Sequence, residues 1–186
     1  MTESKKKKLI ILSHTSRVGK DYLTSLDFRN NGKYDRLPNY VILKDGSVVE
    51  TLSPEKSSEF LEDKKLCDKS IVICLENLGW VNKNLLSTTY SNWLGNKVTD
   101  VHERKWRNKY FWDKYSEEQL QSLVKLCTTL CDEFKIPKKF IGHNTKLNGV
   151  EKFNGIINRS NLSEDYTDLS PAFNFVYLLE NFNDEQ

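Results

Sequence analysis

The feature that most constrains this chain is an apolar run near its start, Leu9 to Leu12, which ends in Ser13-His14-Thr15. A short apolar run bounded by charged and turn residues is typical of a strand that is buried on both faces. Functional side chains of α/β proteins often follow the ends of such rigid elements. His14 is therefore either a hydrogen-bonded residue that caps the strand or part of a functional site.

Three further segments carry strong patterns. Residues 40–50 contain two β-branched runs joined by an Asp-Gly pair, which predicts a hairpin because a tight turn needs the positive φ that these two residues tolerate. Residues 70–77 predict a second buried strand. Ser116 and Gln119 form a capping box that begins a helix, and its apolar stripe extends to Phe134. Strands that alternate with helices predict an α/β fold.

The other segments are less regular. Residues 19–38 predict a long loop with a short helix, and residues 144–165 predict a long polar loop. Residues 80–115 are dense in aromatic side chains and form either a loop that covers the sheet edge or a cleft wall. Residues 139–143 predict a short strand that ends in a second histidine, and Ser170-Pro171 predicts the start of a last helix.

Length and charge place the chain in a broad class. Its 186 residues suit one domain, in which we expect residues 8–180 to form the core and residues 1–7 and 181–186 to be tails. Lys and Arg number 28 against 26 Asp and Glu, so the net charge is +2. This balance gives no reason to expect nucleic acid or a membrane as a partner.

The apolar segments and the cysteines predict a cytoplasmic protein with free thiols. No apolar stretch approaches the roughly 18 residues that span a bilayer, and the apolar segment after the N-terminal lysines is too short for a signal peptide. The four cysteines form no CxxC pair and no zinc-finger spacing. We therefore expect buried, reduced thiols in a reducing compartment.

Three scattered residues are candidates for a metal site. His14 and His143 each end a predicted strand, and Asp168 precedes the predicted last helix. Two imidazoles and one carboxylate are the ligand set of a catalytic zinc, with the fourth position left to water. Their spacing alone does not join them.

The order of the motifs around these residues is more specific. In chain order the motifs are Ile-Leu-Ser-His-Thr, Val-Ile-Leu-Lys-Asp-Gly, Ser-Ile-Val-Ile-Cys-Leu-Glu-Asn, the capped helix, Ile-Gly-His and Thr-Asp-Leu-Ser-Pro-Ala-Phe. This order resembles the zinc-dependent N-acetylmuramoyl-L-alanine amidases, the superfamily of phage amidase-lysozymes and peptidoglycan recognition proteins. The resemblance extends from Leu9 to about Phe175. It implies a central mixed β-sheet flanked by helices, with His14, His143 and Asp168 as ligands of Zn²⁺.

The resemblance also implies an activity. Such an enzyme hydrolyses the amide bond between N-acetylmuramic acid and L-alanine in peptidoglycan, as a phage endolysin does. Zinc lowers the pKa of its bound water to about 7 and polarises the amide carbonyl. We expect a monomer that acts on muramyl peptides and, if a phage encodes it, stays in the host cytoplasm until lysis.

Three positions depart from the family pattern. A tyrosine of the phage members falls at Pro38, a glutamate of the cell-wall amidases at Cys74, and a lysine at Tyr166. Tyr166 is the predicted donor to the oxyanion, and Glu76 the predicted proton shuttle. These departures leave two alternatives to the enzyme: a catalytically impaired module that binds peptidoglycan, or a regulator that binds another protein through its aromatic segment.

Overall fold

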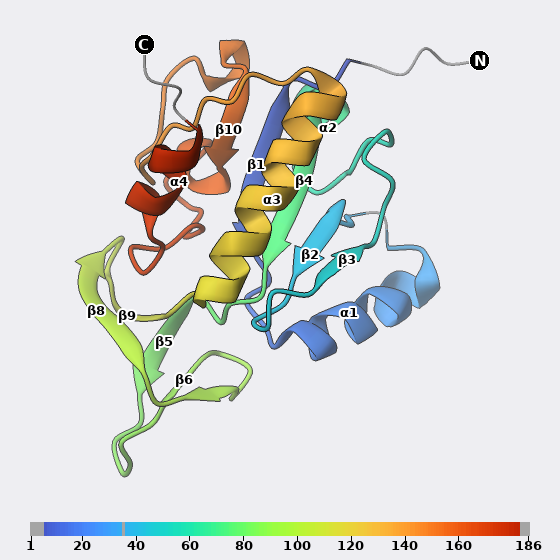
Figure 1. Cartoon of the computed structure of the whole chain (residues 1–186). Helices are drawn as coiled ribbons and strands as arrows, with labels where there is room; N and C mark the ends of the chain where they lie inside the picture. The colour runs from blue at the N-terminus through green and yellow to red at the C-terminus, as the bar shows by residue number, and fades with distance from the viewer. Residues whose placement is uncertain (1–5, 35, 183–186) are drawn as a thin grey trace.

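The computed structural model describes residues 6–34 and 36–182. Within these residues the strands form two five-stranded sheets (Figure 1). The central sheet is mixed, because β10, β1, β4 and β2 are parallel and β3 is antiparallel to β2. In spatial order its strands are β10 (Gly155–Asn158), β1 (Leu9–His14), β4 (Ser70–Leu75), β2 (Tyr40–Ile42) and β3 (Val48–Glu50). The predicted α/β class, both buried strands and the hairpin are confirmed.

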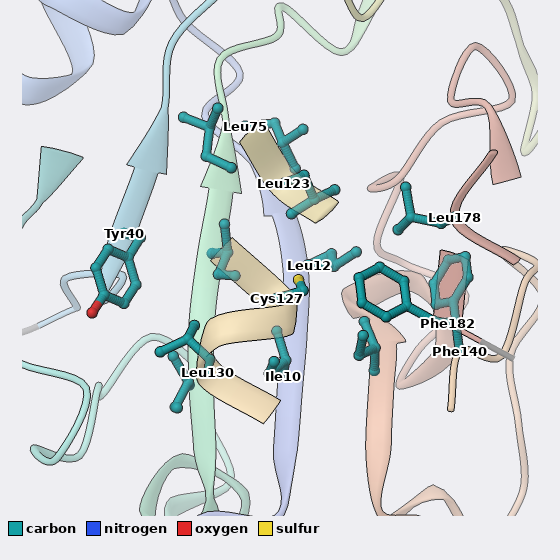
Figure 2. Close-up of a cluster of buried hydrophobic side chains, with 14 of the residues drawn as sticks. Ile10, Leu12, Tyr40, Leu75, Leu123, Cys127, Leu130, Phe140, Leu178 and Phe182 are labelled. Carbon is teal, nitrogen blue, oxygen red and sulfur yellow. The ribbon is translucent and has the colours of Figure 1, made fainter. Parts of the chain in front are cut away.

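Helices cover both faces of the central sheet. On one face α3 (Glu117–Phe134) and α4 (Phe175–Phe182) contribute to the main apolar core. The side chains of β1 at Ile10 and Leu12 pack into this core with residues of α3 and with Phe182 (Figure 2). On the other face lie α1 (Gly19–Phe28) and α2 (Lys64–Lys69), which pack on the alternate residues of β1, β4 and β2. Burial of both faces explains the near-continuous apolar sequence of β1 and β4.

The predicted features of α3 are confirmed. The Ser116 hydroxyl accepts the backbone N–H of Gln119, while the Gln119 side chain accepts the backbone N–H of Ser116. The helix ends at Phe134, and the next residue adopts the left-handed conformation with φ 56°. Cys127 and Cys131 are buried on the core face, so they are core thiols, as their spacing predicts.

Residues 80–115 form a second, antiparallel sheet that extends from one end of the central sheet (Figure 1). Trp112 is the fully buried centre of this sheet. Its ring centroid lies 5.4 Å from that of Trp106, and its Nε1 donates a hydrogen bond to the carbonyl of Arg104 at 2.8 Å. In spatial order the strands are β7 (Lys97–Val98), β6 (Tyr90–Ser91), β5 (Trp80–Lys83), β9 (Lys109–Asp113) and β8 (Val101–Trp106). The loop alternative is therefore wrong, and the cleft-wall alternative stays a prediction. The strands are short and mostly polar, so no apolar run indicates them.

Two expectations near the second histidine are also wrong. The predicted loop at 144–165 contains β10, whose apolar content is limited to Ile156 and Ile157, too short a run to mark a strand by its period. Residues 139–143 form no strand. They contact the outer edge of β10 through a single bridge between Phe140 and Ile156.

Helix boundaries differ in two places. Residues 19–28 form α1, a full helix whose buried face at Tyr22 and Leu26 has few apolar residues to reveal it. The last helix begins at Phe175, later than Ser170-Pro171 predicts, because Asn174 caps it by accepting the backbone N–H of Tyr177 at 3.1 Å.

The predicted tails at 1–7 and 181–186 lie mostly outside the described residues, but Lys7 and Phe182 are buried. Lys7 Nζ donates to the carbonyls of Lys56 and Ser70, both at 2.9 Å. No helix among the described residues is long and apolar enough to cross a membrane.

Candidate functional site

The candidate site lies at the end of the central sheet where its parallel strands have their carboxyl ends. His14 is the last residue of β1, and Arg159 directly follows β10 in the short helix η3 (Arg159–Asn161). Leu12 pairs with Asn158 and Ser13 pairs with Cys74, so Arg159 and Cys74 flank Ser13 from the two neighbouring strands. Carboxyl ends of parallel strands are the usual position of ligand sites in open α/β sheets.

Asp168 is the buried anion of this site. Its carboxylate is fully buried, and the Ser13 hydroxyl donates to Oδ2. Arg159 Nε lies 3.0 Å from Oδ2 and 3.2 Å from Oδ1. Burial alone would raise the pKa of Asp168, but the Arg159 guanidinium, His14 and the Ser13 hydrogen bond hold it below its usual value. Asp168 is therefore a carboxylate that already has a cation and a hydroxyl as partners.

Two aromatic rings hold the Arg159 side chain in place. The guanidinium carbon lies 4.3 Å from the ring centroid of Tyr166 and 5.3 Å from that of Phe60. The side chain is 25% exposed, so most of its contact is with protein. Stacking on two rings and an ion pair to Asp168 together restrict the guanidinium to one position.

His14 is buried with an unused nitrogen. The residue is 6% exposed, and its buried Nδ1 has no hydrogen-bond partner among the described residues. Burial lowers the pKa of His14, while Asp168 opposes this shift, and the net effect favours the neutral imidazole. Gly79 packs on the ring, since a methyl group at position 79 would lie 2.8 Å from Cε1 of His14. Gly79 also has φ +74°, a conformation in which a side chain is strained.

His143 lies apart from this cluster. It is exposed, and its Nδ1 accepts the backbone N–H of Thr145 at 3.3 Å. Its carbonyl accepts from the side chains of Asn158 at 2.8 Å and Asn161 at 2.9 Å, which fixes the backbone here. His143 lines a cavity of about 330 Å³, to which neither His14 nor Asp168 contributes.

As arranged, the three predicted ligands do not fit a zinc ion. The unpaired Nδ1 of His14 suits a metal ligand, but both oxygens of Asp168 contact Arg159. Oδ2 of Asp168 also accepts a hydrogen bond from the Ser13 hydroxyl. Across residues 6–34 and 36–182 no group of three or more His, Cys, Asp or Glu side chains could hold a metal. The zinc site stays a prediction from the sequence.

The predicted catalytic residues lie in different places. Tyr166 is in the site, with its ring against Arg159. Glu76 follows β4 and accepts the backbone N–H of Lys44 at 2.9 Å, which points it toward the β2–β3 hairpin. Their catalytic roles stay predictions. Ser13 and Arg159 are not among the predicted site residues. Arg159 nevertheless follows the apolar pair of β10 after one polar residue, as His14 follows the apolar run of β1.

Cys74 lies inside this buried cluster. It is fully buried in β4, and desolvation raises the pKa of its thiol to about 12. A thiol that stays protonated at neutral pH is a poor nucleophile. The burial of Cys74 agrees with the expectation of buried thiols.

The comparisons with known proteins now identify the family. Residues 3–154 match the N-acetylmuramoyl-L-alanine amidase family, which is more than half of the chain, so this protein belongs to that family. The matched range includes His14 and His143 and ends before Asp168. No curated protein sequence matches the chain.

Solved structures of amidases share the fold. AmiD from E. coli, in complex with anhydro-N-acetylmuramic acid-L-Ala-D-gamma-Glu-L-Lys, is 16% identical with a TM-score of 0.62, and the match covers 97% of this chain and 59% of that one. AmpDh3 from Pseudomonas aeruginosa, in complex with anhydromuramic pentapeptide, is 13% identical with a TM-score of 0.61, covering 97% and 62%. LysC from Clostridium intestinale is 11% identical with a TM-score of 0.53, covering 97% and 87%. The chain spans about three fifths of the first two proteins.

Proposed function

We propose that this protein hydrolyses the amide bond between N-acetylmuramic acid and L-alanine in peptidoglycan. The family match over residues 3–154 carries the proposal. It is supported by the position of His14, a buried neutral imidazole with a free nitrogen at the strand-end edge of the sheet. AmiD and AmpDh3, which have the same fold, were solved with anhydromuramyl peptides bound. Muramyl peptides are accordingly the substrate class that we propose.

Zinc dependence, an endolysin-like role, a monomeric state and a cytoplasmic location belong to the same proposal. For zinc, the predicted ligands remain His14, His143 and Asp168. In the described arrangement His143 lines a separate cavity, and the carboxylate of Asp168 is paired with Arg159.

A second candidate is a protein that binds muramyl peptides without cutting them. The Arg159–Asp168 ion pair favours it, because a carboxylate held by a guanidinium is less available to a metal. Cys74 favours it as well, since a buried thiol of raised pKa replaces a glutamate of the family pattern.

A digestion of purified cell wall separates the two candidates. The wild type is incubated with wall, and the released stem peptides and the bound protein are both measured by mass spectrometry. An amidase releases peptides that begin with L-alanine, whereas a binding protein is retained on the wall and releases none. The zinc content of the protein is measured on the same sample.

Three variants make the digestion specific to the site. His14→Ala should abolish release if the site is where the chemistry occurs. His143→Ala should abolish release together with bound zinc if the predicted ligand set is correct. His102→Gln removes the third histidine, in β8, and should leave release unchanged. Stoichiometric zinc in His143→Ala would contradict the ligand assignment, and full release by His14→Ala would contradict the site itself.

A further inference from the structure

The most unusual contact of the site is the one between Arg159 and Asp168. A carboxylate that is fully buried needs a compensating charge, and Arg159 Nε supplies it within 3.2 Å of both oxygens. The Ser13 hydroxyl donates a hydrogen bond to Oδ2 of Asp168 as well. The buried anion is therefore satisfied by protein groups alone.

A divalent cation and this guanidinium compete for the same oxygens. An arginine keeps its charge at any ordinary pH, so Arg159 cannot yield by losing a proton. Two positive charges on one carboxylate repel each other strongly where water is excluded. A metal must then displace the guanidinium from Asp168, and the rings of Tyr166 and Phe60 hold it there.

We propose that Arg159 is the resident cation of Asp168 and that it keeps divalent metal ions such as Zn²⁺ off this carboxylate. The inference rests on the proposed function, because membership of the amidase family is what makes Asp168 a predicted zinc ligand. It assigns Arg159 a role of its own: the ion pair, rather than the number of nitrogen and oxygen ligands, sets the affinity of the site for metal.

Zinc binding without substrate tests this role. Zn²⁺ is titrated against a chromophoric chelator in competition with the wild type and with Arg159→Gln, which keeps a polar side chain and removes the charge. Arg159→Gln should bind Zn²⁺ on the order of tenfold more tightly than the wild type. Equal or weaker binding by Arg159→Gln would overturn the proposal, because it would mean that Arg159 is neutral toward the metal or positions Asp168 for it.

Matched variants show where the effect originates. Arg36→Gln removes a positive charge from an exposed position and should bind Zn²⁺ as the wild type does. In the Asp168→Asn background the Arg159→Gln substitution should give no gain, since the shared carboxylate is absent. A gain that persists in that background would show that Arg159 acts through general electrostatics and would overturn the proposal.

Two points keep the test decisive. If Arg159→Gln fails to fold, Arg159→Met, which removes the charge and keeps an unbranched side chain, replaces it and should also bind Zn²⁺ more tightly than the wild type; no gain would count against the proposal. The titration contains no peptidoglycan, so a failure of the proposed amidase activity leaves its result unchanged. Conversely, wall digestion by a protein whose Arg159 proves neutral toward zinc would support the function and reject this inference.

Discussion

The central sheet and the second sheet are stabilised in different ways. Every residue of β1 and β4 is buried, and these strands lie between two helical layers. In the second sheet the six residues of β8 are all partly or fully exposed, and the loop between β5 and β6 carries Leu86 at 100% exposure. Burial of apolar area accounts for the first sheet, whereas in the second sheet it is concentrated at Trp112 and Val81.

Contacts between cations and aromatic rings recur in the second sheet. Lys109 Nζ lies 3.6 Å from the ring centroid of Trp80, and the Arg107 guanidinium lies 4.5 Å from that of Trp106. Arg107 also donates to the carbonyls of Ser160 and Ser163, which ties this sheet to the segment that carries Arg159. The site therefore lies between a central sheet stabilised by an apolar core and a second sheet in which polar and cation–aromatic contacts are frequent.

The largest effect is expected for Trp112→Ala. This substitution removes the buried centre of the second sheet and the hydrogen bond to Arg104, and should lower the free energy of unfolding by about 4 kcal/mol. Urea denaturation followed by circular dichroism measures it. A single transition would show that the two sheets unfold together, whereas an early transition of small amplitude would show that the second sheet unfolds by itself.

Leu12→Ala should cost about 3 kcal/mol, because it leaves a cavity in the core between β1 and α3. The matched control is Leu86→Ala, which removes the same atoms from a fully exposed position and should change the free energy of unfolding by less than about 0.5 kcal/mol. Similar losses in the two variants would contradict the contrast between the sheets.

Gly79→Ala acts where the two sheets meet. The added methyl group collides with the His14 ring, and the left-handed backbone is strained, so stability should fall by about 2 kcal/mol. The displaced imidazole should also reduce wall digestion. Gly95→Ala is the control, since Gly95 has a similar φ of +80° and open space around it. Equal effects in both variants would mean that the contact with His14 is unimportant.

The smallest effect is expected at Cys74. Its pKa of about 12 and its complete burial keep the thiol protonated and covered, so iodoacetamide should leave it unmodified in the native protein between pH 7 and pH 9. Mass spectrometry after brief labelling, with and without denaturant, measures the modification. Rapid labelling of the native protein would show that the central sheet opens at this strand.

The sequence predicts the elements whose apolar pattern is long or repeated. β1, β4 and α3 are of this kind, and the alternation of β4 correctly separates Val72 and Cys74 from Ile71 and Ile73. The strands of the second sheet are two to six residues long and largely polar, so no apolar period reveals them. Their pairing depends on aromatic contacts between strands, which a linear pattern does not contain.

The candidate site is predictable only in part, for a similar reason. His14 and Asp168 are recognisable as polar residues beside predicted elements of an α/β chain, and in the structure the two side chains interact electrostatically. The pairing of Arg159 with Asp168 depends on the register of β10 against β1. Since β10 is too short to be recognised from the sequence, neither its register against β1 nor the position of Arg159 beside Asp168 can be predicted.

The pairing of β1 with β10 affects how the chain can fold while it is being synthesised. Leu9 pairs with Gly155, so β1 is among the first described segments to be synthesised and its outer partner is among the last. A nascent chain can pair β1 with β4 while the other edge of this buried, largely apolar strand stays open. Open edges of apolar strands invite association with other chains, so protection during synthesis should matter more for this protein than for one built of local hairpins. Arg159 and Asp168 both follow β10, and the candidate site is therefore completed only after β10 has been synthesised.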